Sequence, residues 1–390
     1  MDMESLQSQI IADIDTAREV IYDLSRRIHD NPELGFKEVQ ASSWIADLLE
    51  NHGFKVQRGI CKFPTAFRAT YGKGKPAISF LAEYDALPDL GHGCGHNLIS
   101  AAAVGAALGA KRAVDTCGGS IQLIGTPAEE LYAGKQVMAQ RGAFRDLDAV
   151  MMIHPDTLDT AVTHALACQR LDIEFFGKAA HAAGNPQAGI NALEAMILSF
   201  NAIDALRQHL PPKAMVHGII TSGGSAANIV PAYSAGNFIV RAADLSTMEE
   251  VKQKVLNCFT GAALSTGAQM EYRWEEHYYA PVVNNLTICR AFVANLKKLG
   301  RKAELDNSDD SFGSTDFGNV SQLVPGMHAQ IAIAPDGIAL HSAQFVKAAI
   351  SDRALNSMLV AAKALALTAA DLLSSPQVLQ RVKNEFLKNS

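Results

Sequence analysis

Three short apolar runs, each bounded by turn residues, constrain the fold of this chain most strongly. They cover residues 77–82, 120–125 and 149–153. Continuous apolar runs of this length are typical of strands that are buried on both faces of a sheet. Helical stretches expected at 99–114 and 131–141 alternate with them. This order predicts an α/β fold built on a parallel or mixed sheet.

Residues that could bind a metal ion or take part in catalysis follow each apolar run. Asp85 follows the first, the pair Glu129 and Glu130 follows the second, and His154 follows the third. Open α/β sheets bind ligands at the carboxyl ends of their strands, so we expect these side chains to lie close together. The pair would allow one carboxylate to bind a metal ion while the other acts as a general base. A solvated helix N-terminus for the pair and a core position for His154 are the simpler alternatives.

Residues 91–97 read GHGCGHN and form the most specific pattern in the chain. Cys94 and His96 are of the types that bind borderline-soft divalent ions, and the glycines allow the backbone to fold tightly around an ion. The alternative is a glycine-rich loop with an incidental thiol. His92 is a third candidate ligand, or else a hydrogen-bond donor next to the ligands. This pattern predicts a metal site.

The C-terminal part of the chain supplies one more candidate ligand. His341 stands in the sequence ALHS, and His328 competes with it for this role. A core histidine is the simpler alternative for His341. Asp85 is of a type that orients a metal-ligating histidine by a hydrogen bond. Together with Cys94, His96 and the residues after the apolar runs, these residues predict a two-metal hydrolytic site.

The pattern changes near Cys168. Residues 168–278 are expected to follow the order strand, helix, strand, strand, helix, strand, which is that of a ferredoxin-like α+β domain. Helix and strand patterns of the first kind resume after Pro281. We therefore predict a catalytic domain of residues 1–167 and 279–390, into which residues 168–278 are inserted.

Three residues of the inserted segment are candidates for contact with a substrate. His181 lies in GKAAHAAG, where nothing local indicates a metal site. Asn228 and Arg241 have side chains that bind carboxylates. Judged by the local pattern alone, a turn and a surface charge explain these two residues better.

Composition argues against several classes of function. The 390 residues carry a net charge of -6 without a long basic run, which argues against nucleic acid as a partner. The six cysteines are scattered, as in proteins of a reducing compartment. The acidic N-terminus lacks the features of a signal peptide, and no apolar stretch approaches the roughly 18 residues of a membrane span. We therefore expect a cytoplasmic protein that acts on a small molecule and does not bind a membrane.

Five motifs that occur in order resemble those of a known family. They are residues 83–88 (EYDALP), 91–97 (GHGCGHN), 127–130 (PAEE), 177–182 (GKAAHA) and 313–321 (GSTDFGNVS). The chain resembles the aminoacylase/carboxypeptidase G metallopeptidases, peptidase family M20, over nearly its whole length. Within the amidohydrolase branch it is most similar to p-aminobenzoyl-glutamate hydrolase subunits and β-alanyl-lysine type dipeptidases.

The resemblance implies a mixed-sheet catalytic domain that binds two divalent ions and an inserted lid domain through which two chains form a homodimer. The implied ligands are Cys94 as the bridge, His96 and His154 on one ion, and Glu130 and His341 on the other. Zn²⁺ and Mn²⁺ are the expected ions, and Co²⁺ or Ni²⁺ are possible substitutes.

The resemblance also implies roles in catalysis. Glu129 falls on the general base, Asp85 on the carboxylate behind a ligand, and His181 on the lid histidine that stabilises the oxyanion in the partner subunit's site. Asn228 falls on the substrate-binding asparagine, and Arg241 is expected to assist it. The implied reaction is hydrolysis of the amide bond of small N-acyl amino acids or dipeptides by metal-activated water. The alternatives are a hydrolytic deaminase or other C–N hydrolase that acts on an aromatic amine, and a non-catalytic metal-binding protein.

Overall fold

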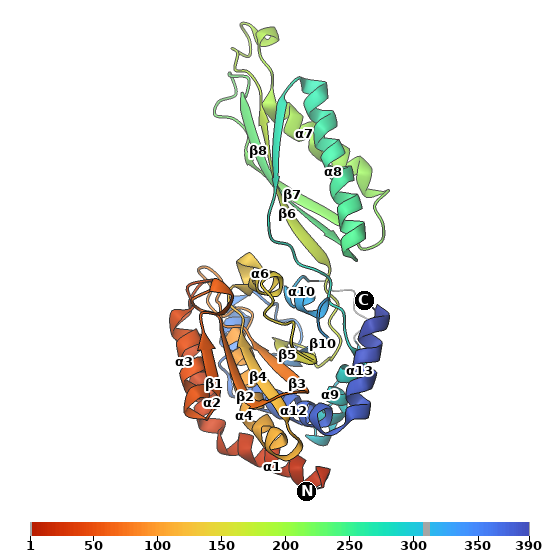
Figure 1. Ribbon diagram of the computed structural model, residues 1–390. Coiled ribbons are helices and arrows are strands. Elements are labelled where there is room, and N and C mark those ends of the chain that lie inside the picture. The colour runs from red at the N-terminus through yellow and green to blue at the C-terminus, as the bar shows by residue number, and fades with distance from the viewer. Residues whose placement is uncertain (1, 307–312, 390) are drawn as a thin grey trace. The chain divides into compact units, whose positions relative to one another are not determined.

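The computed structural model describes residues 2–306 and 313–389, and the chain divides into two compact units (Figure 1). Unit 1 comprises Met1–His164, Val282–Ser311 and Asp316–Ser390, and unit 2 comprises Ala165–Pro281 and Phe312–Thr315. Unit 1 is α/β with a mixed sheet, and unit 2 is α+β with an antiparallel sheet. The predicted fold class is therefore confirmed.

A six-stranded sheet forms the centre of unit 1. Its order is β1 (Lys55–Arg58), β2 (Phe67–Lys73), β4 (Gly119–Gly125), β3 (Ala77–Ala82), β5 (Ala149–Asp156) and β10 (Gly326–Ala332). The four strands β4, β3, β5 and β10 are parallel, whereas β2 runs antiparallel to both β1 and β4. The carboxyl ends of the three strands predicted from apolar runs therefore meet at one edge.

Both faces of this sheet are covered, as its largely apolar central strands require. Successive residues of a strand point to opposite faces, so Phe80 and Leu81 enter two different cores. The larger core also contains residues of α1 (Met3–Thr16), α2 (Arg18–Asp30), α4 (His96–Cys117) and α12 (Asp352–Ser374). The smaller core contains residues of α6 (Gly134–Gln140) and α10 (Phe317–Ser321). The other helices of unit 1 are α3 (Val39–Asn51), α5 (Glu129–Tyr132), α9 (Leu286–Lys298), α11 (Ala343–Ala348) and α13 (Pro376–Asn389).

The N-terminal helix departs from the expectation of one helix over residues 4–30. It is interrupted at Ala17, which ends α1 and precedes α2. No glycine or proline marks this position, so the sequence carries no local stop signal. Ile14 of α1 packs against α4, where a Cβ atom on Gly109 would lie 2.6 Å from the Ile14 side chain. Packing of each segment against α4 determines the break.

The expectation that no apolar stretch approaches the length of a membrane span is wrong for helix α12. It has 23 residues and a mean hydropathy of 1.5 over its most apolar window, which passes the length and composition test for a membrane span. However, 78% of that window is buried inside unit 1. Gly105 of α4 faces Ala362 of α12, and a Cβ atom on this glycine would lie 3.0 Å from that of the alanine. Small residues thus let the two apolar helices pack closely, as in the core of a large unit.

Unit 2 has the predicted order of strands and helices. Its elements are β6 (Ala167–Phe176), α7 (Ala192–Arg207), β7 (Met215–Ser222), β8 (Tyr233–Ala242), α8 (Leu245–Thr266) and β9 (Gln269–Trp274). The antiparallel sheet has the order β7-β8-β6-β9. Figure 1 shows α7 and α8 together on one face of it. Their apolar residues and those of the strands form a separate core, which includes Phe175, Phe238 and Phe259.

Candidate metal centre

The loop between β3 and α4 and the first residue of α4 provide two candidate ligands. Gly95 has a φ of 71°, a left-handed conformation that glycine adopts without steric cost. A Cβ atom at this position would also lie 2.9 Å from Cγ of Pro155, so the backbone approaches the end of β5 closely. Cys94 precedes this turn and His96 is the first residue of α4. The glycine therefore places both side chains against the carboxyl edge of the sheet.

Six of the predicted residues form three overlapping sets that suit a metal ion, one of which consists of His96, Glu129 and Glu130. The ligand atoms of Cys94, His96 and His154 lie within 4.8 Å of one another, as do those of Cys94, Glu130 and His341. Cys94 belongs to both of these sets, and its Sγ atom lies 2.8 Å from Nε2 of His341. Thiolate, imidazole and carboxylate are the ligand types that Zn²⁺ prefers. The residues present therefore fit two neighbouring divalent ions that share one thiolate.

The orientation of His96 supports this fit. Its Nδ1 atom lies 3.0 Å from Oδ1 of Asp85, while Oδ2 of the same carboxylate accepts a hydrogen bond of 3.0 Å from the backbone N–H of Glu130. The other ring nitrogen, Nε2, is buried and has no hydrogen-bond partner among the described residues. Metal-binding histidines characteristically use one nitrogen for a carboxylate and the other for the ion. Asp85 thus lies where a carboxylate that orients a ligand would lie.

His154 is held by its own strand end. Its Nδ1 atom lies 2.8 Å from the carbonyl oxygen of Pro155. Burial lowers the pKa of His154, although the charge of Glu83 acts in the opposite direction. A lowered pKa keeps the imidazole neutral, and a neutral imidazole is the form that binds a metal ion.

The two adjacent glutamates begin a helix rather than continue a strand. Ala128 has a φ of 62°, and the turn it forms leads directly into α5, in which Glu129 and Glu130 are the first residues. Their carboxylates nevertheless reach the same place, because one oxygen of each lies within 4.8 Å of a nitrogen of His96. Burial and the charge of Glu130 raise the pKa of Glu129 well above its usual value. A raised pKa makes the carboxylate of Glu129 a stronger proton acceptor, as a general base requires.

Beside these residues lies an ionic network that was not predicted from the sequence. Nζ of the fully buried Lys135 lies 2.6 Å from Oε1 of Glu83 and 2.6 Å from Oδ1 of Asp316. Burial lowers the pKa of Lys135, but the charges of Asp316 and Glu83 outweigh it and raise the pKa above its usual value. Oε2 of Glu83 in turn lies 3.5 Å from Nε2 of His96. Lys135 and Asp316 are 181 residues apart, so no local pattern could have revealed the pair.

Two further histidines, His92 and His328, are candidate ligands by sequence, but neither belongs to the metal-compatible sets of the described residues. Nε2 of His92 lies 3.1 Å from the carbonyl oxygen of Ile28, and burial lowers the pKa of His92 to about 3. His328 stacks on His154 with 5.6 Å between ring centroids, and its Nδ1 atom lies 3.3 Å from Oγ1 of Thr163. Both side chains therefore have structural contacts, with His328 supporting the ring of a candidate ligand.

The remaining predicted residues belong to unit 2, whereas the metal-compatible residues belong to unit 1. Nδ1 of His181 accepts hydrogen bonds from the backbone N–H groups of Ala183 and Gly184, so its ring proton lies on Nε2. Nη1 of Arg241 donates a 2.6 Å hydrogen bond to Oγ of Ser314. The side chain of Asn228 is exposed.

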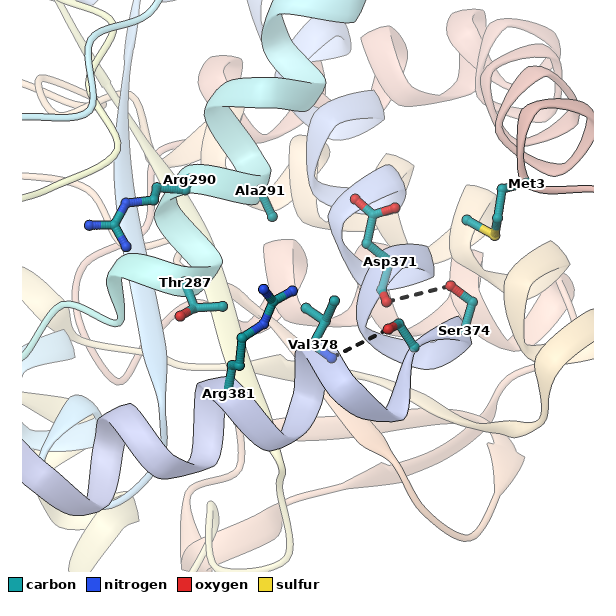
Figure 2. A pocket seen from close by; sticks show the side chains of 9 residues that line it. Met3, Thr287, Arg290, Ala291, Asp371, Ser374, Val378 and Arg381 are labelled. Atoms are coloured by element: carbon teal, nitrogen blue, oxygen red, sulfur yellow. Dashed lines mark hydrogen bonds between the residues drawn. The ribbon is translucent and has the colours of Figure 1, made fainter.

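A pocket lies elsewhere on unit 1, and none of its lining residues belongs to a metal-compatible set. It has a volume of about 540 Å³ and is lined by residues of α1, α9, α12, α13 and the α12–α13 turn (Figure 2). Asp371 in its wall accepts hydrogen bonds from Asn295 and Gln7, which ties the helices together. Figure 2 shows Arg290 pointing away from the other labelled side chains. None of the predicted site residues lines this pocket.

Comparisons with known proteins identify the family of the chain. The sequence profile of peptidase family M20/M25/M40 matches residues 80–370. A mouse (Mus musculus) Xaa-Arg dipeptidase is 38% identical to this chain over 402 residues, which cover 99% of this chain and 93% of the relative. One of the subunits of the p-aminobenzoyl-glutamate hydrolase from Escherichia coli (strain K12) is 30% identical over 446 residues, covering 95% and 93%.

A solved structure shows the same fold. A dinuclear metal-binding peptidase of the M20 family from Bacillus subtilis superposes with a TM-score of 0.71 over 92% of this chain and 99% of its own, at 22% sequence identity. At this identity the comparison establishes the fold, and the two more similar relatives establish the family.

Proposed function

The chain belongs to peptidase family M20/M25/M40, and from this premise we propose that it hydrolyses the amide bond of small N-acyl amino acids or dipeptides. It is a metal-dependent hydrolase of amide or peptide bonds. The names of two relatives support two substrate groups, dipeptides that end in arginine and p-aminobenzoyl-glutamate. β-Alanyl dipeptides form a third group, which the sequence motifs suggest. The observation that carries the proposal is the pair of ligand sets that share Cys94 next to Glu129.

We assign the two ions to the two ligand sets. Cys94, His96 and His154 would hold one, and Cys94, Glu130 and His341 would hold the other. Divalent ions at such a site polarise the amide carbonyl and lower the pKa of water so that it attacks at neutral pH. The mixed thiolate, imidazole and carboxylate ligands favour Zn²⁺, with Mn²⁺ as the second candidate.

Glu129 would move the proton. Its carboxylate takes a proton from the attacking water as the new C–O bond forms at the carbonyl carbon. It then gives that proton to the amide nitrogen as the C–N bond breaks, which releases a carboxylic acid and an amine. Asp85 would keep Nε2 of His96 directed at the ion by its 3.0 Å contact with Nδ1.

We propose that residues of unit 2 complete the reaction, and that His181 does so in the site of the partner subunit. The fixed tautomer of His181 leaves an Nε2–H donor, which suits stabilisation of the oxyanion on the carbonyl oxygen. Asn228 and Arg241 would bind the carboxylate of the substrate, since an amide and a guanidinium both donate hydrogen bonds to carboxylate oxygens. Oγ of Ser314, which accepts from Arg241, would hold the guanidinium in place.

We further propose that two chains associate through unit 2. Strand β7 is an edge of the antiparallel sheet and exposes Ile219 (64%) and Ile220 (42%). Helix α7 exposes Ile197 and Leu198 as well. An edge strand with unpaired backbone groups and exposed apolar residues is a template for pairing with a second chain. A symmetric pairing of two β7 strands would satisfy those groups in both chains.

The test is hydrolysis by chelator-treated protein to which Zn²⁺ or Mn²⁺ is returned. The substrates would be p-aminobenzoyl-glutamate, arginine dipeptides, β-alanyl dipeptides and N-acetyl amino acids, with free amino acid and ammonia both assayed. Release of an amino acid that depends on the returned ion is the expected result. Release of ammonia alone would support a deaminase instead. Binding of two ions without turnover of any substrate would contradict the proposed function.

A further inference from the structure

Three aromatic rings, of which two are partly buried and one is exposed, form a shelf beside helix α5, which carries the glutamate pair of the metal centre. They belong to Phe36, Phe63 and Tyr132, and we call them the aromatic shelf. Ring centroids are 4.6 Å apart for Phe36 and Phe63 and 5.3 Å apart for Phe36 and Tyr132. Tyr132 is 43% exposed. We propose that this shelf binds a flat, neutral aromatic group on the acyl side of the substrate, an inference that rests on the proposed amide hydrolysis.

The position of Tyr132 follows from helix α5. Glu129 and Tyr132 are its first and last residues, and side chains three positions apart on a helix are neighbours, with Cβ atoms about 5–6 Å apart. A residue in the left-handed conformation ends the helix on each side. These residues are Ala128, with a φ of 62°, and Ala133, with a φ of 47°. The ring of Tyr132 therefore starts one helical turn from the proposed general base.

The loop that carries Phe36 is fixed to the same edge of the sheet. Glu33 accepts a 2.8 Å hydrogen bond at its carbonyl oxygen from the backbone N–H of Ala86, which directly follows Asp85. A Cβ atom on Gly35 would lie 2.9 Å from Cβ of Ala128 and 3.2 Å from Cδ2 of Tyr132, so the loop packs tightly on α5. Phe36 itself has a φ of 62°.

The left-handed backbone conformation of Phe36 is strained, and such strain is a reason to assign a function to this residue. A bulky residue in the left-handed region is strained and persists where the surrounding structure imposes this conformation, often at ligand sites. Here the strained backbone turns a ring onto Tyr132 rather than into either core of unit 1, neither of which includes Phe36 among its buried residues.

Charge decides which ligand suits the shelf. The guanidinium carbon of Arg141 already lies 4.8 Å from the ring centroid of Phe63. A second cation on the shelf would be repelled by this one, whereas a neutral ring would stack on Tyr132 without such a penalty. The carbonyl carbon that is attacked belongs to the acyl half of the substrate, so this half lies nearest the water that Glu129 would activate. A benzoyl or aminobenzoyl group has the required shape and charge.

The test compares substrates that differ only in the acyl group. N-benzoyl and N-acetyl derivatives of glutamate and of arginine would be offered to the metal-loaded protein. We expect Tyr132→Ala to lower the benzoyl-to-acetyl ratio of kcat/KM about tenfold, mainly through KM, as loss of one aromatic contact predicts. For Tyr132→Phe this ratio should stay within about twofold of the wild-type value. For Tyr132→Leu it should fall as it does for Tyr132→Ala. Tyr272→Ala, a similarly exposed tyrosine in unit 2, is the control.

A binding measurement separates this inference from the proposed reaction. Calorimetry on the Glu129→Ala protein, which should bind without turnover, would give the Kd of N-benzoyl-glutamate with and without Tyr132→Ala. An approximately tenfold weakening, absent for N-acetyl-glutamate, supports the shelf even if the wild type hydrolyses neither compound. An unchanged benzoyl preference in both assays overturns it.

Discussion

Sγ of Cys94 and Nε2 of His341 lie 2.8 Å apart, although 247 residues separate them in the chain. The backbone supports this contact, because the N–H of His341 donates a 3.1 Å hydrogen bond to the carbonyl oxygen of Gly93. His341 also has a φ of 59°, an uncommon conformation for a residue other than glycine. The glycine-rich loop and the C-terminal histidine are thus held together by the fold of unit 1.

Replacement of the shared thiolate should affect both ions. We expect Cys94→Ser to lower the metal content by at least one ion per chain, because a hydroxyl is a much weaker ligand than a thiolate for Zn²⁺. Elemental analysis after dialysis measures this directly. Cys117→Ser, at an exposed cysteine of the same unit, is the matched control. Full metal content in the Cys94→Ser protein would exclude Cys94 as the bridge.

Substitutions of Glu129 and of Glu130 should have different effects, the first on catalysis and the second on metal binding. Glu129→Gln should lower kcat by about 10²–10⁴ while metal content is kept, because the amide cannot accept the proton. Glu130→Gln should instead reduce the metal content, since it removes a ligand of one set. A Glu129→Gln protein with wild-type kcat would contradict the assigned general base.

The buried charge of Lys135 should be important for stability. Lys135→Met leaves Glu83 and Asp316 as two buried carboxylates without their cation, and loss of one partner of a buried ion pair costs about 3–5 kcal/mol. Chemical denaturation would measure the free energy of unfolding. Lys254→Met removes the cation of an exposed pair with Glu250 and should cost no more than about 1 kcal/mol. Equal losses for the two variants would argue against the network.

Glu38 should make stability depend on pH. Its carboxylate is fully buried and accepts a 2.8 Å hydrogen bond from the backbone N–H of Ala128. Burial and the charge of Asp85 raise the pKa of Glu38 to about 7 from its usual 4.5. The folded state therefore binds the proton of Glu38 more tightly than the unfolded state does. The stabilisation that this proton provides is fully present below pH 4.5 and is lost as the pH rises through 7.

The shift corresponds to about 3 kcal/mol of unfolding free energy between these pH values. Glu38→Gln keeps an oxygen that accepts from Ala128 but does not titrate, so its unfolding free energy should decline less over this range. Denaturation curves at several pH values would measure the difference. Parallel curves for the wild type and the variant would be incompatible with a titrating Glu38.

Association through β7 should be sensitive to a charge on its exposed face. Ile219→Glu should shift the protein from dimer to monomer in sedimentation experiments, because a buried carboxylate without a partner is costly. Leu264→Glu, at an 80% exposed position on α8, should not change the sedimentation. A dimer that persists in the Ile219→Glu protein would place the interface elsewhere.

Several parts of the molecule followed from the sequence because their causes are local. The runs at β3, β4 and β5 are largely apolar, which is typical of strands in a sheet that is buried on both faces. The order of strands and helices in unit 2 followed from its change in periodicity. By contrast, the break at Ala17 and the antiparallel strands β1 and β2 were not predicted, because packing and pairing with distant segments determine them.

The fold class, the family and the residue types of the candidate metal centre could be predicted from the sequence, because the motifs specify spacing and side-chain chemistry. Which atoms meet depends on the tertiary structure. It brought His341 to Cys94, left His92 and His328 among structural contacts, and started a helix at Glu129. It also joined Lys135 to Glu83 and Asp316. Contacts between segments so far apart depend on the packing of the whole unit, and no local pattern records them.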